Sequence, residues 1–225
     1  MVSKIMYIFA HPDDETFTCG GTIAHFAGTG FTRQILYCAT HGEASKTGNP
    51  PVCAPHELGN TRREELQRAA RILGIDQLII RDYGDGRLDH QPFLVLVQDI
   101  QHVLVRENPD LIITFPPSGI SGHKDHKVIQ QATLEAVRKT SFPTKLYYIV
   151  IPESIVHFLG RSVSAVPDRS VSLKIDVTPY RGKIADALKQ HRSQHLSVEK
   201  VFPGVLQGKL DRLRTHEYYQ LVLER

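Results

Sequence analysis

Short apolar runs alternate with amphipathic stretches over the first two-thirds of the chain, and this alternation restricts the fold more than any other feature. Runs such as residues 5–10 and 111–114 are rich in strand-forming residues, which is typical of buried strands. Strands that are joined by helical crossovers run parallel, and the helices cover both faces of the sheet. The pattern therefore predicts an α/β protein with a mainly parallel, Rossmann-like sheet and helices on both faces.

The same pattern places the individual elements. Strands are expected at residues 5–10, 34–39, 77–80, 111–114, 145–151, 171–177 and 218–223. Helices are expected at residues 20–30, 57–73, 91–106, 125–139 and 180–192. A length of 225 residues suits one hydrophobic core, and the sequence has no evident internal repeat or linker. We therefore expect a single domain over residues 1–225.

Composition narrows the class of partner. Hydrophobic residues make up 41% of the chain and charged residues 23%, and the formal net charge of +3 is spread along the sequence. So small an excess does not favour nucleic acid as a partner. No apolar run is long enough for a signal peptide or a bilayer span, and Cys19, Cys38 and Cys53 form no Cys-x-x-Cys motif. The expectation is a soluble, cytoplasmic protein without stable membrane association.

Polar segments follow four of the expected strands. They are residues 11–15, 40–43, 82–89 and 123–126. In parallel sheets, ligands bind outside the carboxyl ends of the strands. Because all four segments lie at such ends, we expect them to meet at one edge of the sheet.

The first of these segments is His11-Pro12-Asp13-Asp14-Glu15. Three neighbouring carboxylates repel one another unless a cation compensates their charge. Imidazole together with carboxylate suits a divalent metal ion, and His11 and Asp14 can reach one ion from a single turn. By itself, the segment is also compatible with a solvated acidic turn in which an Asp caps a helix.

The last segment is His123-Lys124-Asp125-His126. By itself it is equally compatible with a helix N-cap at Asp125 and surface histidines. Its place at the same edge as the first segment favours a metal site instead. A catalytic zinc site uses three protein ligands and keeps a fourth position open.

Three side chains of these two segments can supply that ligand set, namely His11, Asp14 and His126. Asp13, His123 and Asp125 then remain for proton transfer and orientation. Zinc is favoured by the type of ligand, although ferrous iron suits the same residues.

Both segments closely resemble the motifs of the LmbE-like metal-dependent deacetylases, also called the N-acetylglucosaminyl-phosphatidylinositol de-N-acetylase superfamily. The resemblance extends over nearly the whole chain, through residues 19–24, 40–43, 62–66 and 183–194. It implies a hydrolase that removes an N-acetyl group from an N-acetylglucosamine-type sugar conjugate. Members of the family are often oligomeric, so a homo-oligomer is an expectation for this chain.

The resemblance also implies a role for each matching residue. The metal is held at positions that match His11, Asp14 and His126. The residue that matches Asp13 acts as the general base. The residue that matches His123 assists the oxyanion or the leaving group, and the one that matches Asp125 orients and polarises that histidine.

Substrate contacts are assigned to four further side chains, namely Arg62, Glu43, Asp85 and Arg87. Arg62 is also compatible with an exposed residue at the start of a helix, and Asp85 with a simple Gly-Asp-Gly turn. Two positions depart from the family. Lys124 stands where proline is frequent, and Ser121 stands where some members carry a tyrosine proposed to support the oxyanion.

Three alternative functions remain open. The first is an amidase that acts on a larger thiol–sugar conjugate. The second is a catalytically silent metal-binding protein, which Asp13 and His123 argue against because neither is needed to hold a metal. The third is phosphate ester hydrolysis at a two-metal centre, which is weaker because the ligands suffice for one ion only.

Overall fold

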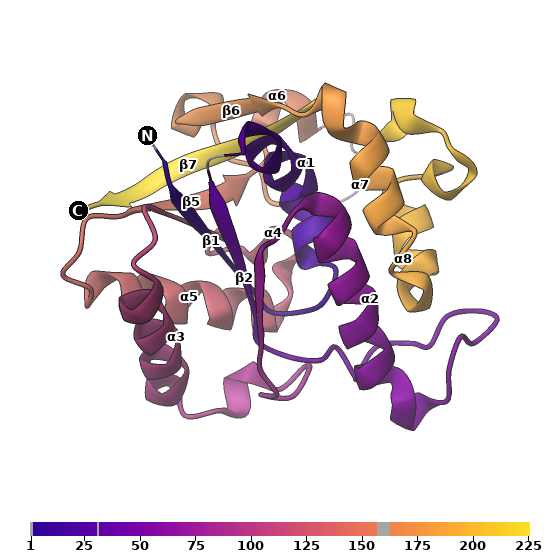
Figure 1. Cartoon of the computed structure of the whole chain (residues 1–225), viewed down its shortest axis with the longest axis horizontal. Helices are drawn as coiled ribbons and strands as arrows, with labels where there is room; N and C mark the ends of the chain where they lie inside the picture. Colours follow the sequence, from indigo (N-terminus) through magenta and orange to yellow (C-terminus); the bar gives the residue numbers. More distant parts are fainter. Residues whose placement is uncertain (1, 31, 157–162) are drawn as a thin grey trace.

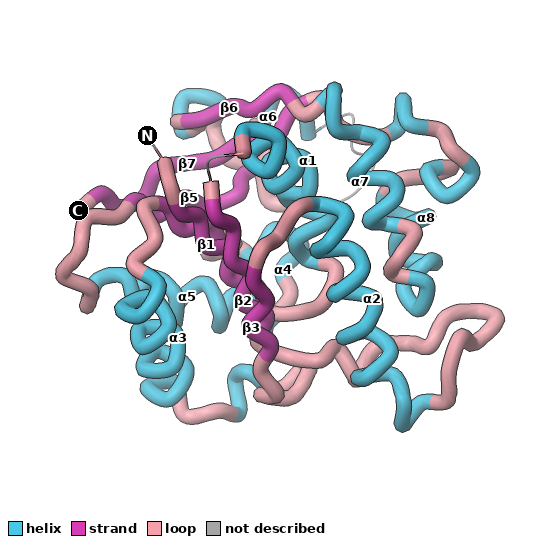
Figure 2. Tube along the Cα trace, in the orientation of Figure 1, coloured by secondary structure: helices cyan, strands magenta, loops and turns pink. Residues whose placement is uncertain are grey.

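The computed structural model describes residues 2–30, 32–156 and 163–225. In these residues one sheet forms the middle layer, with strand order β3-β2-β1-β4-β5-β7-β6 (Figures 1 and 2). The first five strands run parallel: β1 (Lys4–Phe9), β2 (Arg33–Cys38), β3 (Gln77–Ile80), β4 (Leu111–Thr114) and β5 (Lys145–Val150). β7 (His216–Glu224) pairs antiparallel with β5 and with β6 (Leu173–Asp176). The predicted α/β class with a mainly parallel sheet is confirmed.

Helices cover both faces of this sheet (Figure 1). One face carries α1 (Asp14–Thr29), α2 (Leu58–Leu73) and α7 (Arg181–Leu188), which pack on one another. The other face carries α3 (Phe93–Glu107) and α5 (Lys124–Arg138). The short helices are α4 (Gly119–Gly122), α6 (Glu153–Val156) and α8 (His195–Val201). None of the described helices is long and apolar enough to cross a membrane.

The observed elements begin and end close to where the sequence places them. Two helices differ. The first helix starts at Asp14 rather than at residue 20, so its first turn carries the acidic residues of the first motif. The helix expected to run to residue 192 ends at Leu188, and α8 follows after a 3-10 turn. All other expected boundaries lie within two residues of the observed ones.

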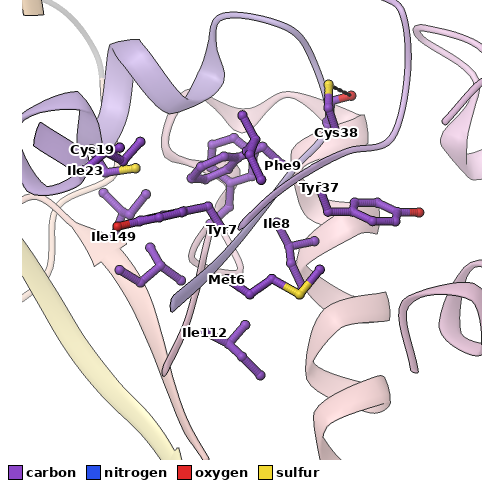
Figure 3. Packing of buried hydrophobic residues seen from close by; sticks show 14 of the residues in the cluster. Met6, Tyr7, Ile8, Phe9, Cys19, Ile23, Tyr37, Cys38, Ile112 and Ile149 are labelled. Carbon is purple, nitrogen blue, oxygen red and sulfur yellow. Dashed lines mark hydrogen bonds between the residues drawn. The ribbon is translucent and has the colours of Figure 1, made fainter. Parts of the chain in front are cut away.

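The centre of the core is β1. Its residues from Ile5 to Phe9 are fully buried, because helices cover the sheet on both sides. Figure 3 shows Tyr7 on the side of Cys19 and Ile23 of α1, whereas Met6 lies on the other side of the strand. This alternation follows from the two-residue period of a strand. Burial on both faces explains why the strand is apolar at every position from Ile5 to Phe9 instead of at every second one.

The strand order also fixes where a ligand can enter. From β1 the chain builds outward to β2 and β3, and it then crosses back to place β4 on the other side of β1. The order therefore reverses between β1 and β4, and the carboxyl ends of these two strands open a crevice. The segment 11–15 follows β1, and the segment 123–126 lies in the connection from β4 to α5. The fold thus brings the two polar motifs to the same crevice.

Candidate metal centre and active site

Three side chains converge in this crevice with the spacing of metal ligands. His11 Nδ1 lies 3.4 Å from Asp14 Oδ2 and 3.2 Å from His126 Nε2, and His126 Nε2 lies 3.2 Å from Asp14 Oδ1. Bonds of about 2.0–2.1 Å in a tetrahedral zinc site place two ligand atoms about 3.3 Å apart. The ring of His123 is also near, so a set of three histidines, His11, His123 and His126, is within reach of one ion.

Hydrogen bonds on the far side of each ring determine which nitrogen is free. His126 Nδ1 lies 3.1 Å from the carbonyl oxygen of Gly119, and His11 Nε2 lies 3.1 Å from Asp125 Oδ2. Because a carbonyl and a carboxylate only accept, these ring nitrogens carry the protons. Neutral rings then present two lone pairs to each other across 3.2 Å. That arrangement requires a cation between them, so the residues fit a divalent metal ion.

The charges of the metal-free site agree with this interpretation. Burial lowers the pKa of His11, but Asp125, Asp14 and Asp85 together hold it well above its usual value. Burial raises the pKa of Asp14, but His126 and His11 hold it well below its usual value. Without a metal, the raised pKa of His11 therefore favours a proton between the ligand side chains. A divalent ion has to displace that proton, which makes metal binding dependent on pH.

Asp125 contacts a different histidine from the one expected. Its carboxylate approaches His11, and it also accepts N–H hydrogen bonds from Gly86 at 2.7 Å and Leu88 at 3.3 Å. Only the backbone N–H of Asp125 contacts His123. Because α5 begins between His123 and Asp125, the carboxylate turns toward the loop that follows β3. The structure therefore places Asp125 behind a metal ligand.

His123 has one ring nitrogen committed and one available. Its Nδ1 accepts the backbone N–H of Asp125 at 3.2 Å, so the neutral ring carries its proton on Nε2. Burial, together with His11 and His126, lowers the pKa of His123. The ring lines the cavity next to the metal ligands. A neutral imidazole in this place can donate a hydrogen bond from Nε2 to an oxygen bound in the cavity.

Asp13 lies beside the metal ligands in an unusual backbone conformation. Its φ is +109°, in the region that disfavours non-glycine residues. Arg62 Nη2 donates to Asp13 Oδ2 at 2.9 Å. Burial raises the pKa of Asp13 to about 6; Arg62 opposes this rise and Asp14 adds to it. A carboxylate with this pKa is ionised near neutral pH and is a stronger base than an ordinary aspartate.

Arg62 is a buried residue rather than a free substrate ligand. It is 2% exposed, and its guanidinium donates to Asp13, to the carbonyl oxygens of Pro12 and Gly42, and to Ser45. Gly42 has a φ of +70°, and a Cβ atom there would lie 2.1 Å from Arg62 Nη1. The loop after β2 therefore depends on glycine to admit the guanidinium. Arg62 still reaches the cavity wall, but its main partner is Asp13.

The other three residues assigned to the substrate are placed differently from one another. Asp85 Oδ1 lies 3.1 Å from His11 Nε2, and Asp85 Oδ2 accepts the N–H of Ala44. Glu43 Oε1 accepts the N–H of Asp85 at 2.7 Å. Asp85 lines the cavity, whereas Glu43 and Arg87 are exposed and do not line it. Within the described residues, Asp85 thus joins Asp125 behind His11.

The crevice opens into a cavity of about 1110 Å³. Its lining includes His11, Asp14 and His126 together with Asp13. A second group of lining residues, which we call the far wall, follows residue 148 and combines apolar, basic and acidic side chains, among them Ile149, Phe202, Lys200, Asp211, Arg212, Arg214, Glu217 and Tyr218. Sequence reasoning did not assign this wall, because no motif marks residues that meet only after the chain has folded.

Two buried residues near Asp13 were also missed. Glu15 accepts the N–H of Asp13 at 3.1 Å, and His191 Nε2 lies 3.3 Å from Glu15 Oε1. The resemblance included His191, but its sequence gave no reason to place it near the first motif. A buried pair of opposite potential charge is visible only in the structure.

A mainly parallel α/β sheet with two histidines and an aspartate converging at its switch point has the arrangement of a ligand site that can hold a divalent metal ion. The model of the GlcNAc-PI de-N-acetylase family, PIG-L, matches residues 6–137, which is more than half of the chain. The chain belongs to this family of deacetylases. The expected family and enzyme class are therefore confirmed.

Curated relatives include two kinds of sugar-conjugate deacetylase. A 1D-myo-inositol 2-acetamido-2-deoxy-alpha-D-glucopyranoside deacetylase from Mycobacteroides abscessus is 29% identical over 226 residues, covering 85% of this chain and 81% of the relative. A probable N-acetyl-alpha-D-glucosaminyl L-malate deacetylase 2 from Bacillus anthracis is 32% identical over 194 residues, covering 84% and 80%. Both alignments extend beyond the two motifs into most of each protein.

Solved structures agree on the fold. The N,N'-diacetylchitobiose deacetylase from Pyrococcus horikoshii superposes with a TM-score of 0.75 at 22% identity, and the match covers 98% of this chain and 84% of that one. At this identity the likeness shows a shared fold and no more.

Proposed function

We propose that this protein is a zinc-dependent hydrolase that removes the acetyl group from an N-acetylglucosamine-type sugar conjugate. The observation that carries the proposal is that two imidazole nitrogens and one carboxylate, from His11, His126 and Asp14, lie within 3.2–3.4 Å of one another. At this spacing all three can bind one ion. Asp13 and His123 lie beside this ligand set, and holding a metal requires neither of them. Their presence argues for catalysis rather than for metal storage.

Each residue has a task in amide hydrolysis. A bound divalent ion lowers the pKa of a water molecule and polarises a carbonyl oxygen. Asp13, ionised and held by Arg62, accepts the proton of the attacking water. His123 donates from Nε2 to the oxygen that gains negative charge, a contribution of about 10²–10³ in rate for one such donor. The leaving nitrogen takes its proton from Asp13 or from His123.

The carboxylates behind His11 position the ligand. Asp125 accepts from His11 Nε2, and Asp85 Oδ1 lies 3.1 Å from the same nitrogen, so the two carboxylates hold the ring and make Nδ1 a better ligand. Two nitrogen ligands and one oxygen ligand suit zinc, and they also suit ferrous iron. We propose zinc as the ion. Metal analysis of protein that was purified without added metal and without oxygen distinguishes the two.

The size of the cavity supports a conjugate rather than a free sugar. At about 1110 Å³ it reaches the upper end of the range for drug-sized ligands. The names of the relatives from Mycobacteroides abscessus and Bacillus anthracis join the sugar to inositol and to malate. An aglycone of that size can occupy the far wall while the acetamido group lies at the metal. The same space favours, as a second candidate, an amidase acting on a larger thiol–sugar conjugate.

Acetate release tests the proposal directly. The panel contains N-acetylglucosamine, its inositol and malate conjugates, N,N'-diacetylchitobiose, and a thiol-bearing conjugate of the inositol sugar. Metal-loaded and chelator-treated protein are compared, and Asp13→Asn serves as the variant without the base. The expected result is metal-dependent acetate release, fastest from one of the conjugates.

Three outcomes separate the candidates. Cleavage of only the thiol-bearing conjugate, without release of acetate from the others, selects the amidase. A tightly bound metal without turnover on any substrate selects a silent metal-binding protein. Near-normal turnover by Asp13→Asn with metal bound removes Asp13 as the base.

A further inference from the structure

Asp13 needs external support to keep its backbone conformation. A φ of +109° is strained for a side-chain-bearing residue. The N–H groups of Thr16 and Phe17 donate to its carbonyl oxygen at 3.0 and 2.9 Å, and two further contacts hold its N–H and its carboxylate. Arg62 binds its carboxylate and the carbonyl oxygen of Pro12, while Glu15 Oε2 accepts its backbone N–H at 3.1 Å. Glu15 lies only two residues further along the chain, so something else has to fix the Glu15 side chain.

His191 and Thr16 supply that fixation at the other oxygen of Glu15. Thr16 Oγ1 donates to Glu15 Oε1 at 2.5 Å, and His191 Nε2 lies 3.3 Å from the same oxygen. Glu15 is 1% exposed and His191 is fully buried. Neither residue lines the large cavity. They therefore do not touch the substrate, and any effect on the reaction passes through Asp13.

The unpaired nitrogen of His191 indicates the direction of this hydrogen bond. His191 Nδ1 is buried and has no hydrogen-bond partner among the residues that the structure describes. Leaving an N–H donor unpaired in that place costs more than leaving a lone pair, because under-satisfied acceptors are better tolerated than orphaned donors. The proton of a neutral ring therefore lies on Nε2, and His191 donates to Thr16 Oγ1 at 3.3 Å, which in turn donates to Glu15 Oε1. Glu15 then has both oxygens engaged, with one bond directed at Asp13.

We propose that His191, acting through Thr16 and Glu15, is a positioning residue that keeps Asp13 in its strained conformation beside the proposed metal ligands. The proposal rests on the function proposed above for Asp13. His191 comes from the segment after α7, and Ser193 of the same segment donates to Glu65 of α2 through both its N–H and its hydroxyl. The C-terminal third of the chain thus supplies a residue, His191, that packs behind Glu15 of the first motif.

Two substitutions at one position test the proposal. His191→Leu removes the donor, whereas His191→Gln places an amide N–H near the position of Nε2. Under the proposal, His191→Leu lowers kcat at least tenfold with KM within twofold of the wild type and one metal still bound. His191→Gln returns kcat to within about threefold of the wild type.

Ser193→Ala is the matched control. It removes the hydroxyl bond to Glu65 at 2.6 Å in the same buried segment without touching Glu15. It is expected to lower the midpoint of thermal unfolding while leaving kcat unchanged. A kcat for His191→Leu no lower than that of Ser193→Ala would overturn the proposal. Equal losses in His191→Leu and His191→Gln would also overturn it.

A crystal structure of His191→Leu gives a readout that does not depend on turnover. The expected change is loss of the bond from Asp13 N–H to Glu15 and a φ of Asp13 outside the left-handed region, with the metal ligands in place. An unchanged Asp13 would overturn the positioning role. If the wild type releases no acetate from any substrate, the proposed function fails, and this structure still decides whether His191 supports Asp13.

Discussion

Two buried carboxylates of this protein are satisfied in opposite ways. Glu217 of β7 is 2% exposed and accepts the N–H groups of Gly21 and Thr22 at 3.0 and 2.7 Å, as well as Nε of Arg214 at 2.8 Å. Asp14 of α1 is 6% exposed, accepts one backbone N–H, that of His11 at 2.8 Å, and otherwise faces imidazole nitrogens of His11 and His126. The fold itself supplies the donors for Glu217. Around Asp14 it supplies one backbone donor, and the remaining sides of the carboxylate face the two rings with which we propose that it binds a metal ion.

The comparison distinguishes a buried charge that helps to hold the fold together from a buried charge that is available to a ligand. A buried charge stabilises the fold, or at least does not oppose it, when donors surround it. The same charge with too few hydrogen-bond donors around it lowers the free energy of unfolding until a ligand binds. Substitutions at the two places should therefore give opposite patterns of effect on metal binding and on unfolding.

Asp14→Asn is expected to have the largest effect. Loss of the only carboxylate in the His/Asp/His set removes tight metal binding, and acetate release falls by about 10³-fold or more if one metal ligand and its charge are lost. Elemental analysis of the dialysed protein and the acetate assay measure the two effects. One retained metal per chain with near-normal turnover would show that the ligand set is the three histidines instead.

Glu217→Ala should have the next largest effect, and on stability. It leaves Arg214 and two backbone N–H groups without their acceptor, so the free energy of unfolding falls by about 3 kcal/mol. Urea denaturation of metal-free protein measures the change. The metal content of the folded variant should equal that of the wild type. A loss of metal with unchanged stability would remove the distinction between the two carboxylates.

Asp125→Asn tests the carboxylate behind the metal ligand, with a smaller effect. The variant keeps an acceptor for His11 Nε2 but loses its charge, so metal affinity falls about 10–100-fold. Competition with a chromogenic chelator measures the affinity. Asp186→Asn, on the exposed side of α7, is the control for net charge and should leave the affinity unchanged. Equal affinities for Asp125→Asn and the wild type would limit Asp125 to holding the loop after β3 through the N–H groups of Gly86 and Leu88.

A third carboxylate, Asp99, lies between the two extremes. Burial raises the pKa of Asp99, but hydrogen bonds from Arg81, Tyr37 and Tyr83 lower it below its usual value. Because the unfolded chain takes up its proton at higher pH, Asp99 stabilises the fold above pH 4, and this stability is lost as the pH falls through the folded pKa.

Asp99→Asn is therefore expected to have the smallest effect. It lowers the free energy of unfolding by about 1 kcal/mol at pH 7, and the difference from the wild type shrinks as the pH falls below 4. Chemical denaturation at pH 7, 5 and 3 measures this. A constant difference over that range would show that the negative charge of Asp99 contributes nothing to the free energy of unfolding.

The architecture was predictable from the sequence because its signals are local. β1 is apolar from Ile5 to Phe9, which indicates a strand covered on both faces, and the Gly74 that ends α2 follows an amphipathic run. The edge of the sheet at which the site lies was predictable for a related reason. In a parallel sheet, the topology alone brings segments after different strands together.

The partners of the site residues were less predictable because they depend on tertiary distances. The sequence places Asp125 between two histidines, yet its carboxylate reaches His11 from another loop. One signal was available for Arg62. It lies four residues before Leu66 and seven before Ala69, on the buried face of α2. A charged residue on such a face requires a buried partner, which here is Asp13.

The far wall of the cavity and the residues assigned to the chemistry come from different parts of the chain, and this affects how members of the family diverge in sequence. All the residues that we assign to the chemistry precede residue 127, whereas Ile149, Phe202 and Tyr218 of the wall come later in the chain. The family model ends at residue 137. Under the function proposed above, changes after residue 148 therefore alter the choice of aglycone and leave the residues of the reaction unchanged. Glu217 and His191 are expected to tolerate fewer substitutions than the rest of this segment, because each contacts a residue of α1.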